Sequence, residues 1–152
     1  LFSANPGQEP RSIQKVASGG ELSRIALAIK TVTANRDGSP ASMVFDEIDT
    51  GIGGRTAQMV AERIAMVAAH RQVLCITHLP QIACMADTHL YISKHVIDNQ
   101  TSTVIHPLTT GERVNEIARM ASGANVSSAS LDNAREMIAY AGVKKEEYKK
   151  NG

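Results

Sequence analysis

The chain has 152 residues, of which 43% are hydrophobic and 20% charged, enough for one soluble domain with its own core. Its net charge of +1 provides no strong field for DNA or an anionic membrane, and 3% aromatic residues without tryptophan disfavour a stacking platform for single-stranded nucleic acid. No apolar run is long enough to cross a bilayer, and no signal-peptide pattern opens the chain. We therefore expect a single α/β domain over residues 1–152, in the cytoplasm.

An irregular segment and an amphipathic helix come first in chain order. Residues 1–15 are rich in turn-forming residues, and so abrupt a start suggests that the chain is cut from a longer protein. A helix is predicted from about Gly19 to Asn35, because apolar residues recur there at helical spacing. Its apolar face is predicted to consist of Leu22, Ile25, Ala26, Ile29 and Val32.

A strand, a helix and a second strand follow. An apolar run at residues 41–45 comes after turn residues and predicts a buried strand. A Gly-rich loop at residues 50–54 leads to a helix from about Thr56 to Ala69, and residues 73–77 form the second apolar strand. The inward face of this helix is predicted to be Ala57, Val60, Ala61, Ile64 and Val67. Two apolar strands joined by a helix predict an α/β fold with a mainly parallel sheet flanked by helices.

The C-terminal part is predicted to alternate short helices with one hairpin. The expected elements are a short helix at 80–85, strands at 89–94 and 102–108 joined across Asp98–Asn99, and helices around 114–121 and 131–141. Residues 144–152 form a charged tail, which we expect to be a solvated helix end or disordered.

Two adjacent carboxylates, Asp46 and Glu47, come directly after the first apolar strand. A buried strand that ends in two acids is costly unless the carboxylates meet a cation or a proton. Nucleotide hydrolases use such a pair: one carboxylate holds Mg²⁺ directly or through water, and the next orients and deprotonates the attacking water. Because parallel strands end at one sheet edge, Asp46, Glu47 and His78 should converge there.

The start of the first helix is a second candidate site. Ser18 and Glu21 are three residues apart and predict a capping box in which Ser18 is the N-cap. Gly19 and Gly20 leave bare backbone N–H groups at the positive end of the helix dipole, which suits a phosphate. A well-capped helix without a ligand is the alternative, and the nearby acidic strand end favours the phosphate.

His78, just past the second strand, can donate a hydrogen bond to a phosphate oxygen or hold the attacking water. The alternative is a histidine that caps the following turn, and the edge that it shares with Asp46 and Glu47 favours the functional interpretation. One part of a nucleotide site is missing, because the chain has no G-x-x-x-x-G-K-[ST] motif to cradle the phosphates. Either the protein is not a nucleotide hydrolase, or that part lies outside this chain.

Three segments, in this order, resemble motifs of the ABC-type ATPases. Residues 17–21 resemble the signature motif, residues 43–47 the Walker B strand with its catalytic glutamate, and His78 the switch histidine. Together they are a specific signal, although each alone is weak. Four longer phrases are similar to the SMC-like DNA-repair ATPases of bacteria: residues 17–24, 45–54, 77–83 and 112–120. The resemblance covers the chain from about residue 2 to residue 138.

The resemblance implies that the chain is the C-terminal half of a split ATPase head. An N-terminal half of the same polypeptide would carry the phosphate-binding loop, with a long antiparallel coiled coil between the halves. Two heads of a homodimer would sandwich ATP and Mg²⁺, and the full-length protein would bind DNA at the nucleoid and act in double-strand-break repair. This chain alone would not hydrolyse ATP, because it lacks the loop motif.

The resemblance also implies a role for each matching residue. Asp46 would bind Mg²⁺ directly or through water, and Glu47 and His78 would be catalytic, all three at the nucleotide of their own head. The residues that would contact the ATP of the opposite head are Ser18, Gly19, Gly20 and Glu21.

This sequence departs from the wider ABC pattern at three positions. Ala17 and Glu21 replace the usual leucine and glutamine of the signature, but the amides at the helix end remain. Gly53 stands where an aspartate of the D-loop is usual, which puts the contact between heads in doubt. Asp49 is the candidate to replace that aspartate.

Other functions stay open. A metal-dependent nuclease or phosphatase could use Asp46, Glu47 and Asp49 but would need a fuller set of acids, and a non-catalytic assembly module would have structural acids. The cysteines, Cys75 and Cys84, lie in apolar surroundings and are predicted to be reduced core residues. A zinc site that combines them with His78 and His89 is disfavoured, because Cys75 and His78 would point to opposite faces of an extended segment.

Overall fold

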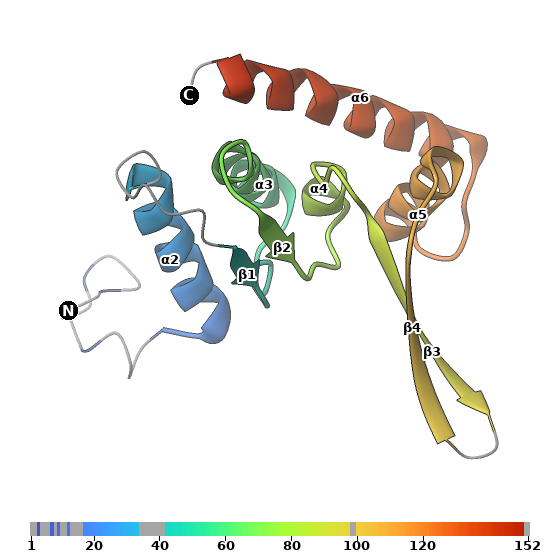
Figure 1. The fold of residues 1–152 in the computed structure, drawn as a ribbon, viewed down its shortest axis with the longest axis horizontal. Helices are drawn as coiled ribbons and strands as arrows, with labels where there is room; N and C mark the ends of the chain where they lie inside the picture. The colour runs from blue at the N-terminus through green and yellow to red at the C-terminus, as the bar shows by residue number, and fades with distance from the viewer. Residues whose placement is uncertain are drawn as a thin grey trace.

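The computed structural model describes residues 17–33, 42–97 and 100–150, together with Ser3, Gly7, Glu9 and Ser12. Most of the segment predicted as irregular therefore lies outside the described residues. The helices are α2 (Gly19–Thr33), α3 (Gly54–Ala68), α4 (Pro80–Ala83), α5 (Thr110–Ser122) and α6 (Ser128–Lys150). The strands are β1 (Met43–Phe45), β2 (Val73–Cys75), β3 (Leu90–Ile97) and β4 (Gln100–Pro107). Figure 1 shows their arrangement, in which β1 and β2 lie next to α3, and α2 packs against α3.

The predicted βαβ unit is confirmed. Strands β1 and β2 pair in parallel, with Met43 opposite Val73 and Phe45 opposite Cys75, and α3 connects them. Because the two strands are in register, the segments that follow Phe45 and Cys75 leave the sheet at the same edge. That edge carries the candidate site.

The prediction of a mainly parallel sheet was only partly right. Strands β3 and β4 form a separate antiparallel hairpin, paired from Leu90–Pro107 to Ile97–Gln100, that projects away from the helices (Figure 1). Each hairpin strand has 8 residues, whereas β1 and β2 have 3 each, so most strand residues are antiparallel. The two strands of a hairpin are joined by one short turn and pair with each other. A parallel sheet, in contrast, extends only when further strands lie beside it, each joined through a crossover connection. The predicted turn, Asp98–Asn99, lies outside the described residues.

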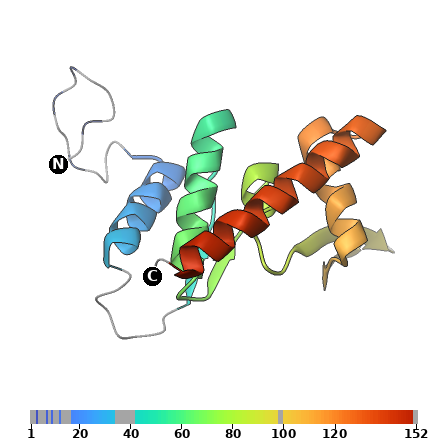
Figure 2. The same cartoon turned by 90° about the horizontal axis from the view of Figure 1, so that it is seen from above.

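The core takes residues from α3, α4, α5 and α6, and it also includes Leu27 of α2 and Phe45 of β1. Of the predicted inward face of α3, Ala57, Ala61, Ile64 and Val67 are buried, and Val60 is partly buried against the core. Helix α6 lies across α3, α4 and α5 (Figure 2) and buries Ala134 and Ala141. The charged tail is helical up to Lys150 and is partly docked, because Lys145 Nζ lies 2.9 Å from Asp87 Oδ1.

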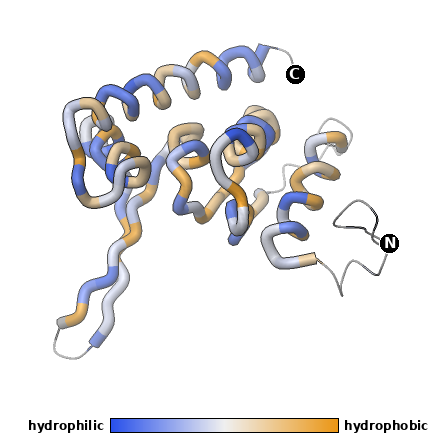
Figure 3. The backbone as a smooth tube through the Cα atoms, turned by 180° about the vertical axis from the view of Figure 1, so that it is seen from behind, coloured by the Kyte–Doolittle hydropathy of each residue, from blue (hydrophilic) through white to orange (hydrophobic). Residues whose placement is uncertain are grey.

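The predicted apolar face of α2 is not buried. Leu22, Ile29 and Val32 are 41%, 58% and 77% exposed, and the residue that enters the core from this helix is Leu27. The hydrophobic residues along α2 are visible in Figure 3. Helical spacing identifies an apolar face but not its partner, and no described element covers this one. Among the described helices, none combines the length and apolar character needed to cross a membrane.

Candidate site at the carboxyl edge of the parallel strands

The predicted capping box is present at the start of α2. The Ser18 amide donates to Glu21 Oε2 at 2.8 Å, and the Glu21 amide donates to Ser18 Oγ at 3.3 Å. The Ser18 hydroxyl also donates to Glu21 Oε2, at 3.0 Å. Both hydrogen bonds that Ser18 donates hold the pKa of the Glu21 carboxyl below its usual value, and the bond from the amide has the larger effect. In this structure Glu21 therefore takes part in capping the N-terminus of α2.

The two glycines of α2 lie directly against the acidic strand end. A Cβ atom on Gly19 would lie 2.9 Å from Glu47 Oε2. A Cβ atom on Gly20 would lie 2.7 Å from the Glu47 carbonyl oxygen and 3.1 Å from Thr50 Cβ. The sequence pattern predicted bare amides here, and the structure adds a second reason for glycine, which is the close approach of two segments. It also places the helix end beside Glu47, although the motifs assigned them to the nucleotides of different heads.

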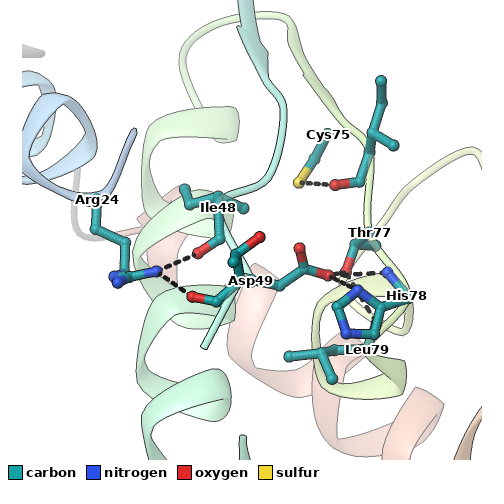
Figure 4. A network of polar contacts seen from close by, with 9 residues as sticks. Arg24, Ile48, Asp49, Cys75, Thr77, His78 and Leu79 are labelled. Atoms are coloured by element: carbon teal, nitrogen blue, oxygen red, sulfur yellow. Dashed lines mark hydrogen bonds and ion pairs between the residues drawn. The ribbon is translucent and has the colours of Figure 1, made fainter. Parts of the chain in front are cut away.

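Two further residues of α2 bind the loop after β1, and sequence reasoning gave them no role. Ser23 Oγ donates to the Asp46 carbonyl oxygen at 3.1 Å. Arg24 Nη1 donates to the carbonyl oxygens of Ile48 and Thr50, both at 3.0 Å (Figure 4). Ser23 and Arg24 follow Gly20 by three and four positions, so they lie on the same face of the helix as Gly20. This spacing is the one feature of the sequence that could have indicated their contact with the loop.

Asp46 and Glu47 are exposed at this edge, and no described residue donates a hydrogen bond to either carboxylate. The backbone of Glu47 has a φ of 57°. Among the described residues that are not glycine, Glu47 is the only one with a positive φ. Left-handed backbone costs such a residue about 1–2 kcal/mol. Glu47 Oε2 lies close to Gly19 at the start of α2, where the backbone amides favour an anion.

Among the residues that the structure describes, Asp49 is the only charged residue that is buried, with 3% of its surface exposed. Its Oδ2 atom accepts hydrogen bonds from the Thr77 hydroxyl at 2.6 Å and the His78 amide at 2.8 Å, and it lies 2.9 Å from His78 Nδ1 (Figure 4). Burial raises the pKa of this carboxyl, but the bonds from Thr77 and His78 outweigh burial and lower the pKa. The loops after β1 and β2 are thus joined through one carboxylate.

The cysteines near the site are free thiols. Cys84 is buried and Cys75 half-buried. Burial, and then the charges of Asp49 and Asp46, raise the pKa of Cys75 to about 12, and burial raises the pKa of Cys84 to about 11. In the described ranges, no group of three or more histidine, cysteine, aspartate or glutamate side chains is placed to hold a metal ion.

Comparisons with known proteins give one consistent relationship, although no family model matches the chain. The DNA repair protein RecN of Bacillus subtilis (strain 168) is 50% identical over 141 residues, which are 93% of this chain and 24% of that protein. The DNA repair protein RecN of Deinococcus radiodurans is 51% identical over 138 residues (91% and 24%), and that of Halalkalibacterium halodurans is 48% identical over 137 residues (90% and 24%).

The chain therefore spans about a quarter of the length of these relatives. Over about nine-tenths of its own length it is homologous to one segment of the RecN proteins.

Proposed function

We propose that this chain is the C-terminal half of the ATPase head of a RecN-like protein. The observation that carries the proposal is the convergence of Asp46, Glu47 and His78 at one edge of β1–β2. In-register parallel pairing ends both strands there, and Asp49 ties His78 to the loop that begins with Asp46. This is the edge at which open α/β folds place their ligands. The relatives are DNA repair proteins by name, and we infer the same role for the whole protein, acting on DNA in the cytoplasm.

The residues at this edge fit a nucleotide with Mg²⁺. The Asp46 carboxylate is exposed and accepts no hydrogen bond from a described residue, so its oxygens are open to a solvated cation. Mg²⁺ commonly takes one or two protein carboxylates together with phosphate oxygens, and when bound it would neutralise charge on the phosphates. Asp46 would hold the ion, and Glu47 would orient the attacking water and accept its proton. His78 would contact the phosphate or the water.

An uncovered apolar face supports a partner in the same head. Val44 and Leu74 are 67% and 46% exposed, whereas Phe45 beside them is buried. Parallel strands are normally covered on both faces, so this side of the sheet lacks a layer. We propose that the N-terminal half, which would bring the missing phosphate-binding loop, covers it. A second head and DNA would be the further partners of the full-length protein.

The proposal is tested by Glu47→Gln in the full-length protein. The amide preserves size and hydrogen bonding but cannot accept the proton, so ATP should still bind while hydrolysis falls by roughly two to four orders of magnitude. The ATP-bound head dimer should then accumulate in size-exclusion chromatography. Glu136→Gln, at an exposed position of α6, is the matched control and should leave turnover unchanged. Unchanged hydrolysis by Glu47→Gln would favour an assembly module with structural acids.

The isolated chain provides a second test. It should not release phosphate from ATP, because Asp46 and Glu47 have no phosphate cradle and no lysine of the loop motif beside them. Robust Mg²⁺-dependent hydrolysis by the purified chain would contradict the half-head and favour a metal-dependent phosphohydrolase.

The role of the α2 start is separated from its capping role by a pair of matched variants. Ser18 and Thr109 both close capping boxes, in α2 and α5 respectively. Replacing either residue by arginine removes a cap at a cost of about 1 kcal/mol. Ser18→Arg should also abolish head engagement and ATP hydrolysis while ATP binding to each head survives, whereas Thr109→Arg should lose stability only. If the two variants hydrolyse ATP equally well, Ser18 only caps the helix and does not contact the nucleotide.

Assignment of the two motifs to opposite heads is tested by mixing. In a heterodimer of Ser18→Arg and Glu47→Gln subunits, both defects can fall on one composite site and leave the other intact. Partial recovery of hydrolysis on mixing, under conditions in which heads exchange, is the expected result.

A further inference from the structure

The buried carboxylate of Asp49 contacts the segment that carries His78. Its Oδ2 atom meets the Thr77 hydroxyl, the His78 amide and the His78 ring at 2.6, 2.8 and 2.9 Å. Thr77 Oγ1 in turn accepts a hydrogen bond from the Leu79 amide at 3.0 Å, so Asp49 Oδ2 and Thr77 Oγ1 together hold the turn before α4 (Figure 4). The side chain of Asp49 is 4% exposed and that of His78 is 73% exposed.

This contact favours a proton on the His78 ring nitrogen that faces the carboxylate. An ionised carboxylate only accepts hydrogen bonds, so the His78 nitrogen that faces it must donate. Nδ1 is that nitrogen, 2.9 Å from Asp49 Oδ2, and we infer that it carries a proton in the neutral as well as in the cationic ring. The other nitrogen, Nε2, makes no hydrogen bond with a described residue, and because the side chain is 73% exposed it remains available to a ligand.

We propose that Asp49 is a positioning residue for His78, which holds the ring by Nδ1–H and presents Nε2 to the nucleotide or to the attacking water. The proposal rests on the proposed function, because it assigns a ligand to Nε2. It gives Asp49 a role within its own head, whereas the sequence pattern suggested a contact with the opposite head. A direct contact of that kind would require the buried carboxylate to leave Thr77 and His78.

The tautomer of His78 is directly measurable. In this chain labelled with ¹⁵N-histidine, long-range ¹H–¹⁵N spectra of the neutral rings distinguish protonated from bare ring nitrogens, and His78→Gln assigns one signal set among the five histidines. We expect the Nδ1–H form at His78, whereas a free imidazole of histidine prefers Nε2–H. An Nε2–H ring in the unsubstituted protein would overturn the proposal without any variant.

Three variants test the cause of that tautomer. Asp49→Asn should shift His78 toward Nε2–H, because the acceptor opposite Nδ1 is weakened. Thr77→Val removes one hydrogen bond to Asp49 but leaves the carboxylate, so the Nδ1–H form should persist. Asp87→Asn, which alters an exposed carboxylate bound to Lys145, is the control and should change nothing at His78. If Thr77→Val moves the His78 tautomer toward Nε2–H as far as Asp49→Asn does, the change reflects a general loosening of the turn around His78, and the proposal is contradicted.

Turnover by the full-length protein tests whether Asp49 acts through His78. Asp49→Asn should lower kcat by about tenfold or more, the size of loss that is typical when a metal-binding histidine loses the carboxylate that orients it. KM for ATP should stay within about twofold, because Asp49 does not touch the substrate. In a His78→Gln background, Asp49→Asn should have no further effect. Additive losses in that double variant would overturn the positioning role.

The two proposals fail in different ways. If Glu47→Gln leaves hydrolysis unchanged, the proposed function fails, and the His78 tautomer still decides whether Asp49 holds the ring. If Glu47→Gln abolishes hydrolysis while His78 carries its proton on Nε2, the proposed function stands and the role of Asp49 is refuted.

Discussion

Gly20 of α2 lies against the backbone of Glu47, and a Cβ atom at Gly20 would come within 2.7 Å of the Glu47 carbonyl oxygen. The contact joins two segments that are 27 positions apart in sequence, and the hydrogen bonds of Ser23 and Arg24 lie beside it. Any change in the position of the α2 end is therefore transmitted to the backbone that carries the proposed base.

Replacement of Gly20 by alanine should destabilise the protein by about 1–3 kcal/mol, because a backbone oxygen cannot move aside as a flexible side chain can. Gly111→Ala in α5 is the matched control, since nothing lies within 4 Å of its added Cβ. It should be neutral or stabilising by up to about 1 kcal/mol. Urea unfolding of the two variants measures both effects, and equal stabilities would show that the α2 end can withdraw from Glu47.

Glu47 itself should be a site at which stability and function conflict. Because its φ is 57°, Glu47→Gly should be more stable than Glu47→Ala by about 1 kcal/mol, while both lose ATP hydrolysis in the full-length protein. At Glu136, in the exposed part of α6, the order should reverse, with glycine less stable than alanine by about 1 kcal/mol. If alanine is the more stable residue at position 47 as well, the left-handed backbone is not retained in solution.

Arg24 should contribute more to stability than an arginine on the surface. Arg24→Met removes the hydrogen bonds to the Ile48 and Thr50 carbonyl oxygens and should cost about 1–3 kcal/mol. Arg135→Met removes an exposed ion pair with Asp132 one turn away on α6 and should cost at most about 0.5 kcal/mol. Thermal unfolding of the two variants compares them directly. A loss at Arg24 no larger than that at Arg135 would mean that the loop after β1 keeps its shape without the arginine.

The two thiols should be unreactive in the folded protein. The pKa of Cys75 is raised to about 12 and that of Cys84 to about 11, so at pH 8 almost no thiolate is present, whereas unfolded cysteine, with a pKa of about 8.5, reacts. Iodoacetamide should therefore label neither residue at pH 8 until urea unfolds the chain, and labelling of native protein should rise only as the pH approaches 11. Rapid alkylation of Cys84 at pH 8 without denaturant would contradict its burial.

Local patterns in the sequence were sufficient for most elements. The capping box of Ser18 and Glu21, the helix α3 and the hairpin β3–β4 depend on residues that are neighbours in sequence, and the structure has all three. The parallel pairing of β1 and β2 was also predictable, because a helix between two apolar strands leaves few other arrangements. The extent of the sheet was not, because an apolar strand does not identify the strands beside it.

The sequence by itself determined the chemical groups that reach the edge of β1–β2, because the strands deliver Asp46, Glu47 and His78 at their ends. Only the tertiary structure decided how those groups are held. Ser23 and Arg24 find acceptors 23 to 26 positions away, and Asp49 meets Thr77 and His78 28 and 29 positions away. Such contacts depend on where whole helices and loops come to lie, and no local spacing encodes that placement. The burial of Asp49 against Thr77 and His78, where the sequence pattern suggested a contact with the opposite head, is the clearest case.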